Sequence, residues 1–196
     1  MDTILRFWFG TETDDAVVAE QRGQLWWKKS PETDAEIRNR FAGVLDEAVN
    51  GRCEQWLEDA RGRLAVIILA DQFSRNMYRD TPRAFASDNL ALSWCKEGLA
   101  AGADRDLRPI ERVFFYLPLE HSESLDDQDR SVALFAELAD SVPDAQGKLF
   151  DGYLDYAARH REIVQRFGRF PHRNAILGRV STAEELAFLK QPGSSF

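Results

Sequence analysis

Helical periodicity runs through almost the whole chain, and it constrains the fold more than any other sequence feature. Residues 34–48 carry apolar side chains at helical spacing, from Ile37 to Ala48, and Gly51 follows as a stop signal. Similar stripes predict helices over residues 84–99, 110–117, 125–139 and 150–167. No segment shows the period-two alternation of a half-buried strand, so the sequence predicts an all-α fold.

Three local signals predict where helices end or begin. Pro118 is expected to end the helix that starts near Ile110. Gly168 stands just after residues 150–167, where a left-handed C-cap is preferred. Ser181 and Glu184 have the spacing of a capping box, which predicts a last short helix through Leu189.

The longest fully apolar run is Leu64 to Ala70. It is far shorter than the roughly 18 residues that a membrane-spanning helix needs, so no membrane partner is expected. Because no partner strand is visible, we interpret residues 64–73 as a central buried helix. Asp71 and Arg75 then form an i,i+4 pair at its polar end.

Length and charge limit the class of protein. The chain has 196 residues, which predicts one helical domain over 1–196. Its formal net charge of −8 disfavours global binding to nucleic acid or to an anionic membrane. The N-terminus lacks a basic, apolar leader, and Cys53 and Cys95 have no metal-ligand spacing. We therefore expect a cytoplasmic protein with two reduced thiols.

Polar residues occupy positions that helical stripes normally give to apolar side chains. They are Asp71, Asp88, Gln128 and His160. A buried polar group costs a few kcal/mol unless it finds a partner. The four residues are therefore expected to meet one another or nearby arginines, and such a cluster is either a binding site or a purely structural network.

Two short segments combine acids with nitrogen-bearing side chains. Residues 71–76 bring the candidate ligands Asp71, Arg75 and Asn76 to the end of the buried run, although a simple helix C-terminus with an ion pair would use the same residues. In residues 118–123, Glu120 and Glu123 flank His121.

His121 has three readings. It is a general base oriented by one of the two acids, a metal ligand, or a residue that packs locally while Ser122 or a nearby acid caps the next helix. The metal reading needs further ligands from His160, His172, Asp71 or Asp88. Because no known metal spacing is present, neither a metal nor another cofactor is expected.

Arginine is concentrated in residues 159–179. This stretch, the C-terminal arginine segment, holds six arginines against one acid, Glu162, for a net charge of +5, so the rest of the chain carries −13. Arginine favours planar, bidentate capture of carboxylate or phosphate. The candidates Arg169, His172, Arg173 and Asn174 lie here. Alternatively, these arginines neutralise acids within the protein, namely Asp71, Asp88, Glu120 and Glu123.

Several stretches resemble a known family. They are DQFxRN (71–76), PLEHSE (118–123), FGRFPHRN (167–174), FWFG (7–10), WW (26–27) and LGRxSTxEE (177–185). In this order they are similar to the bacterial domain-of-unknown-function 924 family over nearly the whole chain, with Ser74 where proline or another small residue is expected. The resemblance implies tetratricopeptide-like antiparallel helix pairs stacked in a right-handed α-superhelix. It implies no activity and no catalytic residues.

Three classes of function follow as hypotheses. The first is a binding module for a small anionic molecule or a peptide carboxylate, since stacked helix pairs form a concave groove. Its candidate ligands are Asp71, Arg75, Asn76, Glu120, His121, Glu123, His160, Arg169, His172, Arg173 and Asn174. The second is a hydrolase that uses Glu120 or His121 with His160 or His172 as acid and base. The third is a protein–protein scaffold, if Trp26 and Trp27 are exposed rather than anchoring the N-terminal helices.

Overall fold

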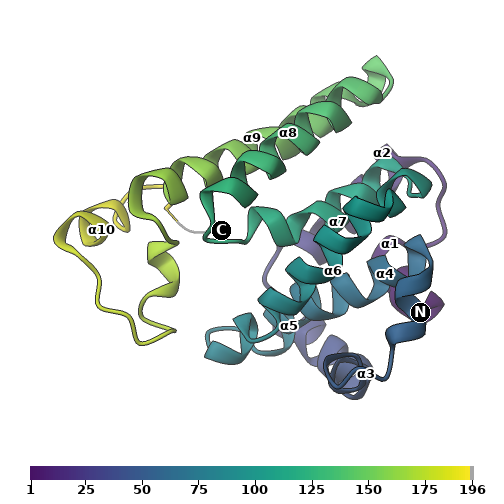
Figure 1. The fold of residues 1–196 in the computed structure, drawn as a ribbon, viewed down its shortest axis with the longest axis horizontal. Coiled ribbons are helices and arrows are strands. Elements are labelled where there is room, and N and C mark those ends of the chain that lie inside the picture. Colours follow the sequence, from purple (N-terminus) through teal and green to yellow (C-terminus); the bar gives the residue numbers. More distant parts are fainter. Residues whose placement is uncertain (195–196) are drawn as a thin grey trace.

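A computed structural model describes residues 1–194, and in that range the chain forms helices and no β-strand, which confirms the all-α class (Figure 1). The α-helices are α1 (Asp2–Phe9), α2 (Asp15–Trp27), α3 (Pro31–Val49), α4 (Ala60–Ile67), α5 (Ser74–Met77), α6 (Asp88–Ala101), α7 (Pro109–Glu120), α8 (Leu125–Ser141), α9 (Asp144–Phe167) and α10 (Ala183–Phe188). Short 3-10 helices cover Glu54–Glu58, Pro82–Phe85, Ala103–Asp106 and Pro171–Arg173, and a π-helix covers Ile68–Phe73.

The apolar run forms the centre of the molecule, as expected. Helix α4 continues without a break through the π-helix Ile68–Phe73 into α5, and the side chains from Leu64 to Phe73 are buried. A π-helix is rare and is found frequently at functional sites. Here it carries Asp71, whose side chain is only 1% exposed.

Aromatic rings lock the N-terminal helices onto this centre. Trp8 lies edge-on to Phe73 and Phe114, each with ring centroids 5.4 Å away. The indole of Trp26 donates a hydrogen bond of 3.0 Å to the carbonyl of Trp8. Trp26 is therefore a buried anchor, whereas its neighbour Trp27 is 53% exposed. Trp26 therefore has the anchoring role that the sequence left open, and Trp27 has the exposed position that a partner surface needs.

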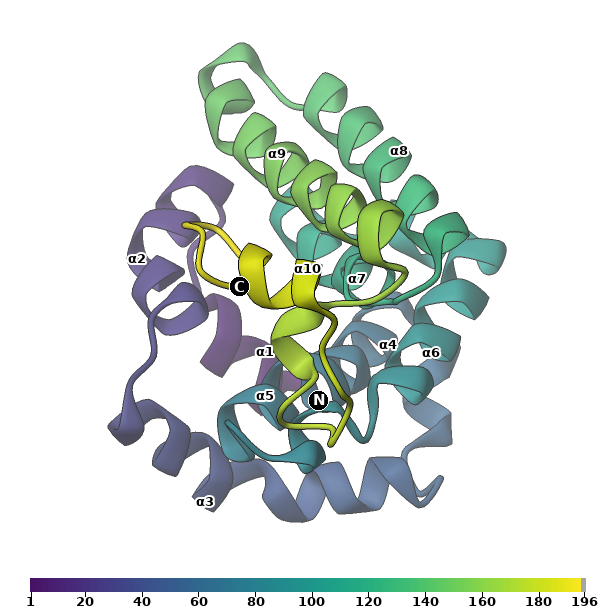
Figure 2. The ribbon, with the colours of Figure 1, turned by 90° about the vertical axis from the view of Figure 1, so that its left-hand side faces the viewer.

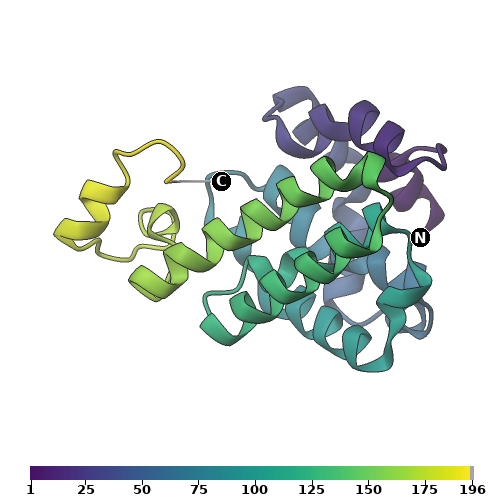
Figure 3. The ribbon, with the colours of Figure 1, turned by 90° about the horizontal axis from the view of Figure 1, so that it is seen from above.

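A long antiparallel pair, α8 and α9, packs on α7 (Figures 1 and 3). Gly168 ends α9 at φ 68°, and its N–H donates to the carbonyl of Val164, so the predicted left-handed cap is confirmed. The chain then turns into the C-terminal segment, which lies at the end of α9 and includes α10 (Figure 3). This turn brings residues 170–173 back toward the end of α7.

Several predicted helix boundaries were wrong. Pro118 does not end its helix, because α7 continues to Glu120; a proline in the last turn removes only one hydrogen bond, and the surrounding side chains are buried. The capping box lies one residue later than predicted, with Thr182 at the N-cap and Glu185 at the third position. The helix predicted from residue 84 begins at Asp88, because Pro82–Phe85 forms a 3-10 turn first.

Helix α9 begins at Asp144, before the predicted start at residue 150. The stacked-pair superhelix and the single domain over 1–196 stay predictions, and residues 195–196 lie outside the described part of the chain. Within residues 1–194 no helix is long and apolar enough to cross a membrane.

Candidate functional site

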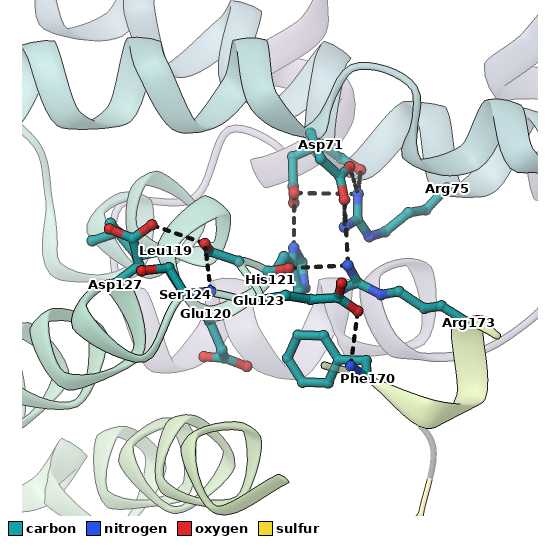
Figure 4. Close-up of polar contacts among 12 residues, drawn as sticks. Asp71, Arg75, Leu119, Glu120, His121, Glu123, Ser124, Asp127, Phe170 and Arg173 are labelled. Atoms are coloured by element: carbon teal, nitrogen blue, oxygen red, sulfur yellow. Dashed lines mark hydrogen bonds and ion pairs between the residues drawn. The ribbon is translucent and has the colours of Figure 1, made fainter. Parts of the chain in front are cut away.

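Four separate stretches of chain meet at the C-terminal end of α7. The π-helix contributes Asp71, the end of α7 contributes Glu120 and His121, and α9 contributes His160. The 3-10 turn after α9 contributes Arg173 (Figure 4). We name these five residues, with Arg75 and Asp88, the polar cluster.

Asp71 and His121 form the shortest contact in the polar cluster. Oδ1 of Asp71 lies 2.7 Å from Nδ1 of His121 (Figure 4). Burial alone would raise the pKa of Asp71, but the charge of Arg75 and the contact with His121 outweigh burial and lower it. Burial lowers the pKa of His121 despite the opposing charge of Asp71. At neutral pH the carboxylate is therefore ionised and accepts the Nδ1 proton, which leaves Nε2 of His121 as a base.

Two arginines neutralise the acids around this pair. Arg75 donates to both carboxylate oxygens of Asp88, at 2.9 and 3.0 Å, and also to the carbonyl of Asp71 at 2.8 Å. Arg173 donates to the carbonyl of His121 at 3.0 Å and lies 3.6 Å from Asp88. Burial and the nearby Arg75 lower the pKa of Arg173 to about 10, so it stays charged at neutral pH.

Glu120 and His160 form a second pair, in which both groups are neutral at pH 7. Nδ1 of His160 lies 2.8 Å from the carbonyl of Tyr156 and 3.0 Å from Oε1 of Glu120. Because a carbonyl only accepts, this Nδ1 carries the proton of the imidazole. Burial and the negative charge of Asp71 raise the pKa of Glu120 to about 8, whereas burial lowers the pKa of His160 to about 3.

The two pairs are neighbours, although Glu120 and His121 point in different directions from α7 (Figure 4). The imidazole centroids of His121 and His160 are 6.1 Å apart. The ring of Phe170 then lies between His160, at 5.6 Å, and His172, at 5.7 Å. Burial lowers the pKa of His172 to about 4. All three histidines predicted as candidates therefore gather on one side of α7.

Glu123 fixes the returning chain against α7. Its Oε1 accepts the backbone N–H of Phe170 at 2.8 Å, and its two oxygens accept from Arg179 at 2.7 and 2.9 Å. The rings of Phe85 and Phe170 lie 4.9 and 4.5 Å from the guanidinium carbon of Arg173. Glu123 therefore acts through the position of the loop and of Arg173 rather than through direct contact with His121.

Gln128 is one of the four polar residues that occupy apolar stripe positions, and it supports the end of α7. Its side-chain amide donates to the carbonyls of Glu120 and Ser122, at 2.6 and 2.7 Å. Ser122 donates to the side chain of Asp127, but the N-cap of α8 is Ser124 and has no side-chain cap, so the predicted capping of this helix by Ser122 is not found. The bonds of Gln128 satisfy carbonyls that the helix end leaves unpaired, and they hold the backbone of His121 in place.

Three candidate residues turn away from the polar cluster. Asn76 donates to Asp34 at 2.9 Å, on the other side of α5. Arg169 binds both oxygens of Glu185, at 2.7 and 2.9 Å. Asn174 donates to Ser181 and accepts from Arg179. The contacts of Arg169 and Asn174 order the C-terminal segment, whereas that of Asn76 joins α5 to α3.

Most arginines of the C-terminal arginine segment are neutralised within the protein. Carboxylates pair with Arg161, Arg166, Arg169, Arg173 and Arg179. The guanidinium of the sixth, Arg159, lies over the ring of Tyr156. The intramolecular reading of this segment therefore describes its contacts, although the partner acids include Asp129, Glu184 and Glu185, which that reading did not name.

Sequence reasoning did not single out the aromatic rings around Arg173 or the role of Arg179. Phe170 lies within the C-terminal arginine segment, which is the sequence signal for its second role, whereas no sequence signal connects Phe85 with Arg173. In residues 1–194 no group of three or more His, Cys, Asp or Glu side chains is arranged to hold a metal ion.

Comparison with known proteins places this geometry in a family without an assigned activity. No curated protein matches the chain. A solved structure, that of the protein of unknown function ATU0120 from Agrobacterium tumefaciens, is similar with 36% sequence identity and a TM-score of 0.77. The similarity covers 90% of this chain and 99% of that one. The model of the family described as bacterial protein of unknown function (DUF924) matches residues 4–193, so the chain belongs to the DUF924 family.

Proposed function

We propose that the polar cluster is an acid–base catalytic site and that the protein is a hydrolase acting on a small polar substrate. The observation that carries the proposal is the contact of 2.7 Å between Asp71 and His121, beside a second imidazole 6.1 Å away. A buried carboxylate that fixes the tautomer and orientation of an imidazole is the arrangement that general-base catalysis uses.

His121 acts as the base in this proposal. Its side chain is 15% exposed, so one edge of the ring reaches solvent, while Asp71 behind it is buried. Nε2 takes a proton from the attacking water, and the ionised Asp71 stabilises the imidazolium that forms. Arg75, whose Nη1 lies 3.2 Å from Oδ1 of Asp71, keeps this carboxylate ionised.

Glu120 supplies the proton donor. Its raised pKa, about 8, keeps it protonated at neutral pH, whereas Asp71 stays ionised. Two neighbouring carboxyl groups with pKa values pushed in opposite directions are typical of sites that hold an acid and a base together. Nδ1 of His160 already carries a proton and lies 3.0 Å from Oε1 of Glu120, so His160 positions this carboxyl group, and Glu120 gives its proton directly to the leaving group of the substrate.

Binding of a small anion or a peptide carboxylate without catalysis is the second candidate. It is favoured by Arg173, which is buried and whose Nε has no hydrogen-bond partner in the described residues 1–194. Against it stands the pairing of Arg75, Arg169 and Arg173 with carboxylates. The exposed ring of Trp27 is the observation that favours a scaffold role.

The test is hydrolysis of small chromogenic esters, amides and phosphate esters from pH 5 to pH 9. The variants His121→Gln and Asp71→Asn are each expected to lower kcat by at least about 100-fold. Arg166→Gln, which removes an exposed ion pair with Glu184 outside the polar cluster, is the matched control and keeps the wild-type rate. The rate should also fall as the pH rises through about 8, where Glu120 loses its proton.

Two results count against the proposal. One is a substrate that is hydrolysed as fast by His121→Gln as by the wild type. The other is the absence of hydrolysis for all three substrate classes over the whole pH range. Protection of the wild type against thermal unfolding by acetate or a short peptide, lost in Arg173→Gln, would then favour the binding candidate.

A further inference from the structure

A hollow lined by arginines lies on the N-terminal helices, away from the polar cluster. Helices α1, α2 and α3 are labelled in Figure 2, and their side chains line a space of about 650 Å³. Each helix contributes one arginine to its lining, namely Arg6, Arg22 and Arg40. We name this space the arginine hollow. The only carboxylate in its lining is Glu36.

Two of these arginines have no acid to neutralise them. Neither Arg6 nor Arg22 forms an ion pair with a carboxylate among residues 1–194, and the Nε of Arg22 is buried without a hydrogen-bond partner. Arg40 pairs with Glu36 at 2.7 Å and lies over the ring of Phe7 at 4.7 Å. Arg6 and Arg22 therefore bring two positive charges without a partner acid to one space, and an anion in the hollow would balance them.

The backbone at Gly10 makes room for Arg22. Gly10 has φ 76° and ψ −148°, a conformation that residues other than glycine rarely adopt. A Cβ atom at this position would lie 2.6 Å from Nη2 of Arg22. The guanidinium therefore packs directly on the glycine backbone at the end of α1. A special backbone conformation thus gives Arg22 its position in the lining of the hollow.

The arginine hollow continues into a second space. That space, of about 530 Å³, shares Leu25 and Thr33 with the first and adds Lys28 and Lys29 between α2 and α3. Its one acid, Glu32, accepts a hydrogen bond from Ser30. Together the two spaces present five cationic side chains against two carboxylates, on a protein whose net charge is −8.

We propose that the arginine hollow binds a small molecule that carries two or more phosphate or carboxylate groups. Arginine presents paired N–H donors that match both kinds of oxyanion, and cations from three helices suit a ligand with more than one charged group. Phe7 and Leu25 give the space an apolar wall for the uncharged part of the ligand. This site is independent of the acid–base site.

The experiment titrates tripolyphosphate and citrate into the full-length protein by isothermal titration calorimetry at constant ionic strength. Orthophosphate is the single-group reference. At least one of the two oligoanions is expected to bind the wild type about tenfold more tightly than orthophosphate does. Binding of tripolyphosphate alone identifies phosphate groups as the ligand chemistry, binding of citrate alone identifies carboxylates, and binding of both supports the shared chemistry.

Three variants locate the site. Arg22→Gln and Arg6→Gln are each expected to weaken the oligoanion at least about tenfold. Arg105→Gln, which removes an equally charged, exposed arginine without an ion-pair partner in residues 1–194, is the matched control and leaves the affinity unchanged. Arg6 is exposed on α1, so its variant keeps the fold even if Arg22→Gln loses stability.

Two outcomes overturn the proposal. The first is that neither oligoanion binds the wild type more tightly than orthophosphate. The second is that Arg105→Gln weakens binding as much as Arg6→Gln and Arg22→Gln do, because the oligoanion would then respond to overall charge rather than to the hollow.

Discussion

The arginine hollow and the C-terminal arginine segment use the same side chain in opposite ways. In the segment, five of six arginines pair with carboxylates, and those contacts join α9 and the chain after it to α6, α8, α10 and the loop after α7. In the hollow, Arg6 and Arg22 have no such partner among residues 1–194. A high local density of arginine is therefore a poor guide to a ligand site. What matters is whether the fold has already supplied each guanidinium with an acid.

The largest expected effect is a difference in the free energy of unfolding between a variant of a paired arginine, Arg173, and a variant of an unpaired one, Arg22. Arg173→Met leaves the carbonyl of His121 without its donor and removes the contact with Asp88, so the free energy of unfolding should fall by about 3 kcal/mol. Arg22→Met should change it by less than about 1 kcal/mol, since no ion pair is broken. Urea unfolding of both variants checks this. Equal losses would break the comparison.

The next effect is the pH dependence of Glu120. Its pKa in the folded protein, about 8, lies above the ordinary 4.5, so its contribution to stability is complete below pH 4.5 and is lost as the pH rises through 8. Glu120→Gln keeps a neutral side chain at every pH. From pH 5 to pH 7 the free energy of unfolding of the wild type should fall by about 2 kcal/mol relative to that of this variant. Parallel stability curves would show that Glu120 is ionised in the folded protein.

His160 changes stability in the other direction. Its pKa in the folded protein, about 3, lies below the ordinary 6.5, so its contribution is present above pH 6.5 and is lost as the pH falls. The variant Glu120→Gln retains His160. The difference in free energy of unfolding between the wild type and this variant, taken at each pH, therefore leaves out the contribution of His160.

A smaller effect is expected at Gly10. Alanine there would be strained at φ 76° and would push the guanidinium of Arg22 aside, so Gly10→Ala should cost about 1–2 kcal/mol in thermal or urea unfolding. Gly147→Ala in α9, where a Cβ atom would meet nothing within 4 Å, is the control. Because it lies within a helix, that change should leave stability equal or slightly higher. A neutral Gly10→Ala would mean that the glycine does not fix Arg22.

The smallest effect is expected at the exposed end of the C-terminal arginine segment. Arg166 and Glu184 are 2.8 Å apart, but both side chains are about half exposed or more. Arg166→Gln should therefore lower the free energy of unfolding by less than about 0.5 kcal/mol, and added salt should remove even that. Chemical unfolding at low and high salt checks it. A loss as large as that of Arg173→Met would show that exposed and buried ion pairs contribute equally to the free energy of unfolding.

Part of the candidate site was readable from the sequence because its parts are local. Asp71 and Arg75 are one helical turn apart, and Glu120 and His121 are adjacent at a helix end, so their residue types and spacing already indicated polar chemistry. The contact between Asp71 and His121 joins residues 50 positions apart. No periodicity connects them, and the sequence left open whether His121 acts as a base, binds a metal or packs locally.

The sequence by itself determined the all-α class, the buried central run and the glycine that ends α9. These features depend on side chains within a few positions of one another, where propensity, periodicity and capping act. Only the tertiary structure decided which charges are neutralised. Arg6, Arg22 and Arg40 come from three helices, and Arg179 meets Glu123 across 56 positions. Coulombic pairing depends on distance in space, which helix packing sets and local sequence does not encode.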